Sequence, residues 1–435
     1  MNATETPATA TAATAAPTAT ATATRSTAAT GTTATTPTAA TTSIVAGGRP
    51  GDAVTVHHLR VSGTQREIGR ALAEAAEAAH GAAAAPRPTD PFMERVRRQW
   101  FAANHPTHTA RMAGIADHFG LDPDDPNLVY DWLGTYDVPA GCSVAFYPGD
   151  GTKDGHGLLS RNFDFPTATF TQIVGLPPLP GERPLAADPW IIETHPDEGY
   201  ASVVVAIMDL MGAMDGINEA GLSVALLADN ETPEPEPTGQ PQVGLSEQQV
   251  VRHLLDTCAT VDEARAALLL AKHYYFFTPC HFVVADRTGA SFVWEHSPRR
   301  NREVIVDQDP ALAGRVVCTN HLLHRWPDPS ALPADDGPMG TAALTYDRWR
   351  TLAGELGDGA IVDRDDIRAQ FARVRFEAPI VEARTFWHAL YDVDDAAAFA
   401  LSWLSPGLAL AAHGTMAAYY LTEQSSRLNA AGSAA

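Results

Sequence analysis

The first strongly patterned region of the chain alternates between apolar and polar positions and then changes to helical spacing. Residues 54–61 alternate as a half-buried strand does. Apolar side chains then recur at helical spacing from Ile68, and again within 92–101 and 112–119. We therefore expect residues 51–141 to form a strand and three helices that pack against the rest of the chain, because large apolar residues are too few there for a separate core.

From Cys142 onward the pattern becomes rich in strands. Short apolar or β-branched runs bounded by Gly, Pro and Asp predict strands at 143–147, 157–160, 190–193, 201–208, 222–227, 281–285, 291–295, 303–306 and 315–318. Helices are predicted at 246–258 and 260–270, each opened by a capping box, near 345–356 and near 365–374, and a short final strand near 415–420. Blocks of antiparallel strands and blocks of helices predict stacked layers, in which helices cover two sheets.

The two ends of the chain differ from this pattern. Residues 1–50 are almost entirely Ala and Thr with scattered Pro, and they lack the basic start and compact apolar region of a secretory signal. Such a segment buries too little apolar surface to offset the entropy of ordering it, so we expect it to be disordered. Residues 426–435 are expected to be a flexible tail.

Composition and charge narrow the class of protein. The chain has 435 residues, 45% of them apolar, which suits a globular protein with a sizeable core. Its net charge of −22 disfavours nucleic acid and anionic membranes as partners. No apolar run is long enough to span a membrane, and the simplest interpretation is a cytoplasmic enzyme with reduced thiols. We expect no cofactor; a homo-oligomer is possible.

The cysteines and histidines do not form a recognisable metal site. The four cysteines are widely spaced, without a CxxC pair. The neighbouring histidines 57 and 58, and 321 and 324, lack a third clustered ligand. We therefore predict no metal, and we expect Cys280 and Cys318 to be core residues.

The dipeptide Gly141-Cys142 suggests a more specific chemistry. Because Gly141 has no side chain, the Cys142 thiol has free access to the preceding carbonyl, and an N→S acyl shift followed by hydrolysis would cut the chain there. Cys142 would then begin a new chain and carry its own base, an α-amine with a reference pKa of about 7.7–8.0. The alternative is that Cys142 is simply a small buried core residue.

Several motifs, in order along residues 54–422, resemble those of N-terminal-nucleophile (Ntn) hydrolases. They are the pairing of 141–143 with 158–164, and the stretches 62–70, 215–222, 318–321, 345–349 and 385–392. The resemblance is to the group of isopenicillin N and 6-aminopenicillanate acyltransferases (peptidase C45), and more distantly to choloylglycine hydrolases. It implies a four-layer αββα sandwich, with residues 51–141 as the alpha chain and 142–425 as the catalytic beta chain of one precursor.

The resemblance also implies roles for individual residues. Asn320 would donate its amide to the oxyanion of the tetrahedral intermediate. Arg161 would hold the substrate and favour the thiolate form of Cys142, and Asp164 would orient the new α-ammonium group. Arg348 would be a cation behind the site or at the substrate, and the alternative is an exposed helix arginine paired with Asp347 or Glu355.

One departure from the pattern concerns the second oxyanion donor. Choloylglycine hydrolases carry an asparagine soon after the NExGL hairpin, whereas here the aligned position is about Ala228, followed by Asp229 and Asn230. A backbone N–H or Asn230 is therefore expected to serve, and the departure favours the acyltransferase branch.

Together these observations predict an autoprocessed cysteine enzyme that forms an acyl-enzyme on Cys142. The expected substrate is a small-molecule N-acyl amide or an acyl-CoA. We favour hydrolysis of a linear amide C–N bond, with transfer of the acyl group to an amine as the alternative. A self-processed binding protein without catalysis is a third interpretation.

Overall fold

The computed structural model describes residues 40–48, 54–81, 87–130, 141–173, 176–207, 210–231, 238–297, 302–335, 344–354, 359–375, 377–378, 383–395, 402–405 and 420–422. Most of the segment predicted to be disordered, and the whole predicted tail at 426–435, lie outside these residues. Within the former segment, however, Ala40–Gly47 forms a strand, β1, rather than disordered chain. It pairs antiparallel with β2, because its β-branched residues Thr41, Thr42, Ile44 and Val45 find a partner strand that the local sequence does not reveal.

The described strands form two large sheets and one small one. A nine-stranded sheet has the order β1, β2 (Thr55–Gly63), β7 (Trp190–Pro196), β8 (Ser202–Ala206), β9 (Asp215–Asn218), β10 (Ser223–Ala228), β11 (Cys280–Ala285), β12 (Ser291–Ser297), β13 (Arg302–Asp307). A seven-stranded sheet has the order β14 (Val316–Cys318), β5 (Gly141–Tyr147), β6 (Leu158–Pro166), β16 (Ala383–Asp392), β17 (Ser402–Ser405), β18 (Tyr420–Thr422), with β15 (Glu377–Ala378) also beside β16. The short strands β3 (Arg87–Pro88) and β4 (Leu128–Val129) pair separately.

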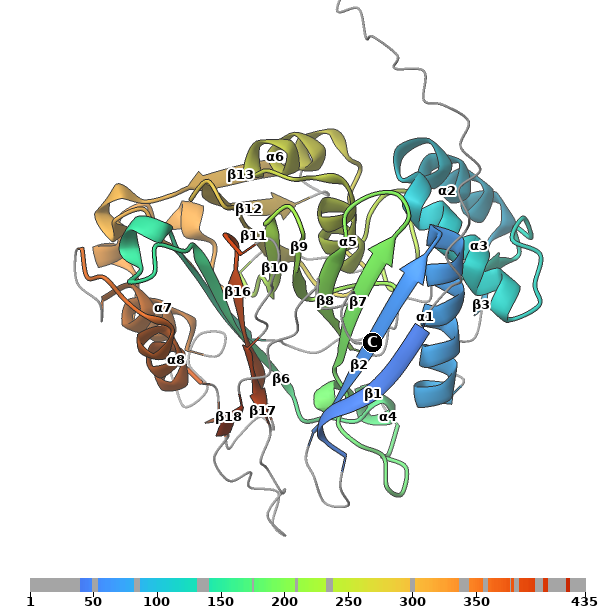
Figure 1. The fold of residues 1–435 in the computed structure, drawn as a ribbon, viewed down its shortest axis with the longest axis horizontal. Coiled ribbons are helices and arrows are strands. Elements are labelled where there is room, and N and C mark those ends of the chain that lie inside the picture. Colours follow the sequence, from blue (N-terminus) through green and yellow to red (C-terminus); the bar gives the residue numbers. More distant parts are fainter. Residues whose placement is uncertain are drawn as a thin grey trace, which may run out of the picture. The chain divides into compact units, whose positions relative to one another are not determined.

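Helices cover the outer faces of both large sheets. On the nine-stranded sheet, α1 (Gln65–His80) packs on β2 and β7, α5 (Glu247–Thr257) on β9 and β10, and α6 (Val261–Leu270) on β11. On the seven-stranded sheet, α7 (Thr345–Gly354) packs on β14 and β5, and α8 (Arg364–Arg373) on β6 (Figure 1). The sheets face each other, with β5 against β10 and β14 against β12. The predicted four-layer αββα sandwich is confirmed.

The region before Cys142 is joined to this sandwich more closely than its helical pattern indicates. β2 pairs in parallel with β7, so it is part of the nine-stranded sheet. The helices α2 (Pro91–Asn104) and α3 (Pro106–His118) pack beyond α1, and the short helix α4 (Phe170–Ile173) follows β6. α1 and α3 approach closely at Gly69 and Gly114, where an added Cβ would lie 2.1 Å from the carbonyl oxygen of Arg111 or 1.9 Å from that of Arg66.

The core lies between the two sheets and beneath the helices. All nine residues of β6 are buried. Among them are Arg161, Asn162 and Asp164. Burying charged groups costs free energy unless they are paired, so these positions call for a functional or structural explanation.

Candidate active site

The pairing of β5 with β6 places the predicted nucleophile beside the predicted cation. Cys142 lies opposite Phe163, and Val144 lies opposite Arg161. Side chains alternate between the two faces of a strand, so Cys142, Phe163 and Arg161 share the face turned toward the nine-stranded sheet. Asp164 belongs to the other face, toward α7.

Cys142 is contacted through each of its polar groups by a different predicted residue. Its thiol is 1% exposed, and Sγ lies 3.4 Å from Arg161 Nη2. Its backbone N–H donates to Asn320 Oδ1 at 3.0 Å, and its carbonyl oxygen accepts from Arg348 Nη1 at 2.5 Å. The structure thus brings together residues that are up to 206 positions apart in the sequence.

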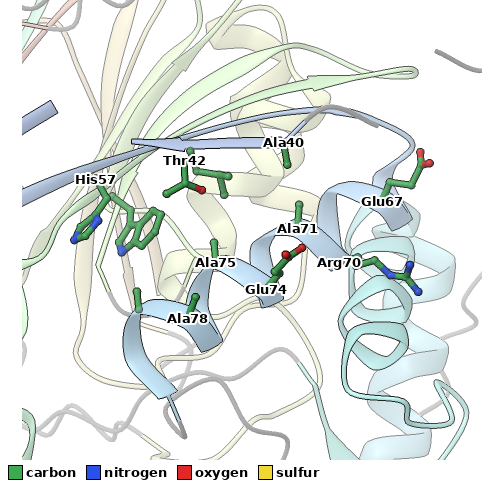
Figure 2. A pocket seen from close by; sticks show the side chains of 12 residues that line it. Ala40, Thr42, His57, Glu67, Arg70, Ala71, Glu74, Ala75 and Ala78 are labelled. Carbon is green, nitrogen blue, oxygen red and sulfur yellow. The ribbon is translucent and has the colours of Figure 1, made fainter. Parts of the chain in front are cut away.

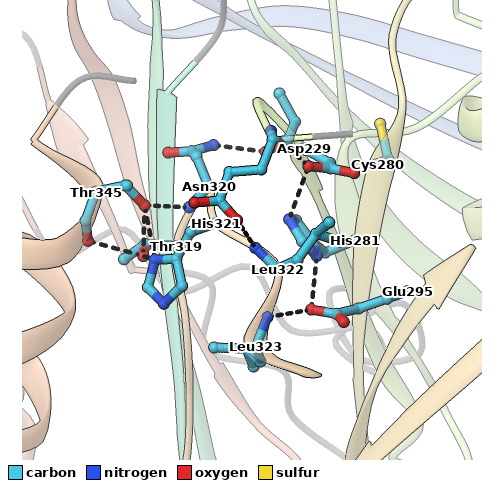
Figure 3. Close-up of polar contacts among 12 residues, drawn as sticks. Asp229, Cys280, His281, Glu295, Thr319, Asn320, His321, Leu322, Leu323 and Thr345 are labelled. Carbon is cyan, nitrogen blue, oxygen red and sulfur yellow. Dashed lines mark hydrogen bonds and ion pairs between the residues drawn. The ribbon is translucent and has the colours of Figure 1, made fainter. Parts of the chain in front are cut away.

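Asn320 follows β14, the strand that pairs with the other side of β5, and it is fully buried. Its Nδ2 donates to the carbonyl oxygen of Ala228 at 2.7 Å, while its Oδ1 accepts from Arg348 Nη2 at 2.5 Å. Arginine can only donate, so this contact settles the orientation of the amide. Its backbone N–H donates to Thr345 Oγ1, as Figure 3 shows.

Arg348 and Asp164 form a buried pair behind Cys142. Arg348 is 4% exposed, which rules out the alternative of an exposed helix arginine. Besides Cys142 and Asn320, it donates to Ser143 Oγ at 2.8 Å and approaches Asp164 Oδ2 at 3.4 Å. Burial lowers the pKa of Arg348 and raises the pKa of Asp164, and in each case the charge of the partner opposes the shift.

In the uncleaved chain the polar contacts of Asp164 are with groups other than the Cys142 nitrogen, and its role toward the new α-ammonium group stays a prediction. Its carboxylate accepts from the Thr385 hydroxyl and from Arg348. The Cys142 nitrogen, which Asp164 was expected to orient, donates to Asn320 instead in the continuous chain. The physical reason is the strand alternation, because Asp164 lies on the face of β6 away from the thiol.

Asn230 lies next to Asn320, and the contact that the structure gives is through the backbone. The N–H of Asn230 donates to the carbonyl oxygen of Asn320 at 3.0 Å. The Ala228–Asn230 segment therefore holds Asn320 from two sides, by its own carbonyl and by its own N–H.

Sequence reasoning missed the partners of Arg161. Its Nη1 forms a buried ion pair with Asp215, which also accepts from the Tyr391 hydroxyl, and its Nη2 donates to the carbonyl oxygen of Leu226 at 2.9 Å. Asp215 opens the hairpin motif 215–222 and Tyr391 lies within the motif 385–392, so both lay in recognised stretches. The signal that could have revealed the partners of Arg161 was a polar residue within an otherwise apolar strand.

A small, mainly apolar cavity adjoins the thiol. It has a volume of about 50 Å³, and its walls include Cys142, Phe163, Leu226 and Phe277. A carboxylate outside the predicted set, Glu247 at the start of α5, also lines it. The Glu247 carboxylate accepts from the backbone N–H groups of residues 276–278, and burial raises its pKa to about 7.

A larger hollow lies away from this chemistry. It has a volume of about 710 Å³ and is bounded by β1, β2 and α1, where Ala71, Ala75 and Ala78 leave space opposite His57 and Trp190 (Figure 2). None of the predicted site residues lines it. We therefore place the candidate site at the smaller cavity, since it contains the thiol.

The described residues contain neither a candidate metal site nor a candidate membrane-spanning helix. Among them there is no group of three or more His, Cys, Asp or Glu side chains that could hold a metal ion. No helix in the described part of the chain is both long and apolar enough to cross a membrane.

Comparison with family models gives a match over part of the chain. Residues 151–332 match the family model described as acyl-coenzyme A:6-aminopenicillanic acid acyl-transferase. This segment contains Arg161, Asp164, Asn230 and Asn320, and it stops short of Cys142 and Arg348. Comparison with curated proteins found no match.

The search of solved structures gives several matches at low identity. Penicillin V acylase from Agrobacterium tumefaciens is 17% identical, with 61% of this chain and 82% of that chain covered and a TM-score of 0.38. A mutant of conjugated bile acid hydrolase from Clostridium perfringens is 15% identical (61% and 89% covered, TM-score 0.40). The Caenorhabditis elegans orthologue of N-acylethanolamine-hydrolyzing acid amidase is 16% identical (59% and 95% covered, TM-score 0.37).

The predicted resemblance is confirmed over residues 151–332, where the chain is similar to the acyl-coenzyme A:6-aminopenicillanic acid acyl-transferases.

Proposed function

We propose that this protein cuts its own chain between Gly141 and Cys142 and then hydrolyses a linear amide through an acyl-enzyme on Cys142. The observation that carries the proposal is the arrangement around Cys142. Arg161, Asn320 and Arg348 contact its thiol, its nitrogen and its carbonyl oxygen, and the thiol opens onto an apolar cavity.

The first step would be self-cleavage. Cys142 Sγ attacks the carbonyl carbon of Gly141, the C–N bond breaks, and the Cys142 nitrogen leaves as an amine, so that Gly141 is held as a thioester. Water then hydrolyses the thioester and regenerates the thiol. Gly141 lies within β5 opposite Asp164, so the bond to be cut is held in a paired strand.

In the catalytic cycle the same thiol attacks the substrate carbonyl. The Cys142 amine takes the thiol proton and passes it to the leaving amine, and the acyl group remains on sulfur as a thioester. The Asn320 amide is the proposed oxyanion donor, and such a donor typically contributes about 3–4 kcal/mol to the transition state. Its Nδ2 carries two hydrogens, and Ala228 accepts one of them.

Transfer of the acyl group to an amine is the second candidate function. The description of the matching family, which is an acyl-transfer reaction from a CoA thioester, favours it. The two outcomes share the acyl-enzyme and differ in whether water or an amine attacks it. A third possibility is a self-processed binding protein that forms no acyl-enzyme.

Intact-mass analysis of the purified protein tests self-cleavage. We expect two chains, the second beginning at Cys142, and a single chain for Cys142→Ala. Cys258→Ala is the matched control, because this buried thiol lies outside the cavity and its loss should leave cleavage intact. A wild-type chain that stays whole and inactive would refute the proposal.

Incubating the processed protein with a panel of N-acyl amides and acyl-CoA thioesters, with and without amine acceptors, tests the chemistry. We expect an acyl adduct on the chain that begins at Cys142, and free acid as product. If an N-acyl product forms when an amine acceptor is present, and no product forms without it, acyl transfer is favoured over hydrolysis. Cleaved protein that never forms an adduct would favour the binding protein.

A further inference from the structure

The segment that carries Asn320, residues 319–325, is held from behind by two carboxylates, the buried Glu295 and the partly buried Glu231. Glu295 accepts the backbone N–H of Leu323 at 2.6 Å and that of His324 at 3.2 Å, as well as the His324 ring N–H. Glu231 accepts the N–H of Leu322 at 3.0 Å and the Tyr346 hydroxyl. These contacts tie the chain that follows β14 to β12 and to the segment after β10.

His281 lies at the centre of this arrangement (Figure 3). It is fully buried on β11 and lies directly opposite Glu295 on β12. Its Nδ1 is 3.4 Å from Glu295 Oε1, and its Nε2 is 4.0 Å from Asp229 Oδ1. One imidazole ring thus lies between two carboxylates that come from different parts of the chain.

The two carboxylates beside His281, Glu295 and Asp229, each belong to a segment that supports Asn320. Glu295 holds the residues that follow Asn320 in the chain. Asp229 lies between Ala228, which accepts from the Asn320 side chain, and Asn230, which donates to the Asn320 backbone. His281 is therefore the group shared by both sides of the Asn320 support.

The electrostatic surroundings favour a protonated ring. Burial opposes the charged form, but the neighbouring carboxylates of Glu295, Asp229 and Glu231 outweigh it and raise the pKa of His281. For Glu295 burial would raise the pKa, yet His281 and His324 hold it at about 2. His321, also nearby, is kept neutral because burial lowers its pKa to about 3.

We propose that His281, as an imidazolium bridging Asp229 and Glu295, is a positioning residue that fixes Asn320 against Cys142. This inference rests on the proposed function, because it gives Asn320 its part in the acyl-transfer chemistry. His281 itself touches neither the thiol nor the substrate cavity. Its effect on rate would come entirely through the placement of the Asn320 segment.

The sign of the pH effect follows from the raised pKa. The charged bridge is fully present below the ordinary pKa of histidine, about 6.5, and it is lost as the pH rises through the raised pKa of the folded protein. Above that pH, Asp229 and Glu295 face a neutral ring. Wild-type turnover should then fall on the alkaline side as His281 loses its proton. The His281→Gln variant has no such titrating group and should lack this fall.

The test compares the processed wild type with His281→Gln, Glu295→Gln and a control, His156→Gln. His156 also pairs with a carboxylate, Asp392 at 2.8 Å, but it lies beyond the end of β6 that is far from Cys142. The readouts are kcat and KM over a range of pH, and hydrogen exchange of the backbone amides of residues 322–324.

We expect His281→Gln to lower kcat by roughly 10- to 100-fold with little change in KM, since a displacement of about 1 Å is enough for such a loss. Exchange at 322–324 should be faster, and the alkaline limb should disappear. Glu295→Gln, which remains informative if the first variant does not fold, should give the same pattern, and His156→Gln should behave as the wild type.

A kcat that is unchanged in both His281→Gln and Glu295→Gln would overturn the proposal, whatever the amide exchange shows. A loss of kcat that the control His156→Gln shares would overturn it as well. If the wild type never forms an acyl-enzyme, the proposed function fails instead. In that case the exchange rates at 322–324 alone decide whether His281 holds this segment.

Discussion

Replacing Arg348 with methionine should reveal how strongly the site depends on one buried cation. The change removes the group that contacts the Cys142 carbonyl, Ser143 Oγ and Asn320 Oδ1. It also leaves the Asp164 carboxylate, which is 0% exposed, without its cationic neighbour on α7. Methionine fills similar space, so the effect should be mainly electrostatic.

The expected loss of folding free energy has one part that depends on pH and one part that does not. An uncompensated buried charge costs about 3–5 kcal/mol. Protonating Asp164 instead costs at most about 4 kcal/mol at pH 7, because the unfolded carboxyl has a pKa of about 3.9 and each unit contributes about 1.4 kcal/mol. Hydrogen bonds lost at the other acceptors add about 1–3 kcal/mol at any pH.

The sign of the pH dependence follows from Asp164. Its pKa, already raised by burial in the wild type, rises further without Arg348, so the folded variant binds a proton that the unfolded chain releases. The loss of stability should therefore be greatest near pH 7 and shrink toward pH 4. At pH 7 we expect a total of about 5 kcal/mol, a large part of the stability of an ordinary domain.

Urea denaturation at pH 4, 5.5 and 7 measures this loss. All variants should carry Cys142→Ala, so that every chain compared is a single uncleaved chain. Adding Asp164→Asn to Arg348→Met should remove the pH-dependent part. Arg66→Met is the control, because its pair with Asp117 at 2.6 Å is half exposed and should contribute about 1 kcal/mol or less.

A loss below about 1 kcal/mol for Arg348→Met, or one that does not change between pH 4 and 7, would refute the reasoning about Asp164. The same conclusion would follow if Asp164→Asn failed to restore any stability in the double variant.

Two further predictions concern groups that the motifs did not single out. Glu247 has its pKa raised to about 7, so wild-type stability should fall by about 3 kcal/mol as the pH rises from 4.5 to 7, and thermal melts of Glu247→Gln should lack this slope. Asp215→Asn breaks the buried pair with Arg161 and should cost about 3–5 kcal/mol in urea denaturation. Tyr391→Phe leaves that pair intact and should cost only about 1 kcal/mol, and equal losses for the two would contradict the buried-pair interpretation.

Much of the fold followed from local pattern. The capping box predicted at the start of 246–258 opens α5, and the hairpin motif 215–222 contains β9 and the turn into β10. Such signals depend on neighbours within one or two turns of chain, which a sequence displays directly. β1 and the parallel pairing of β2 with β7 were not foreseen, because strand pairing joins segments that are distant in sequence.

The candidate site divides in the same way. The motifs named Cys142, Arg161, Asp164, Asn320 and Arg348, and the structure brings all of them into one cluster. The motifs did not predict which atoms of these residues contact one another. That Asp164 faces Arg348 and Thr385 rather than the Cys142 nitrogen follows from strand alternation and register.

By itself, then, the sequence predicted the layered αββα class through its motifs, together with the position of the candidate nucleophile and the residue types that surround it. Only the tertiary structure decided that Arg161 is paired with Asp215, that Arg348 is buried over β5, and that His281 lies between Asp229 and Glu295. The physical reason is that the energy of a buried charge depends on partners from other strands and helices, and no local spacing encodes those partners.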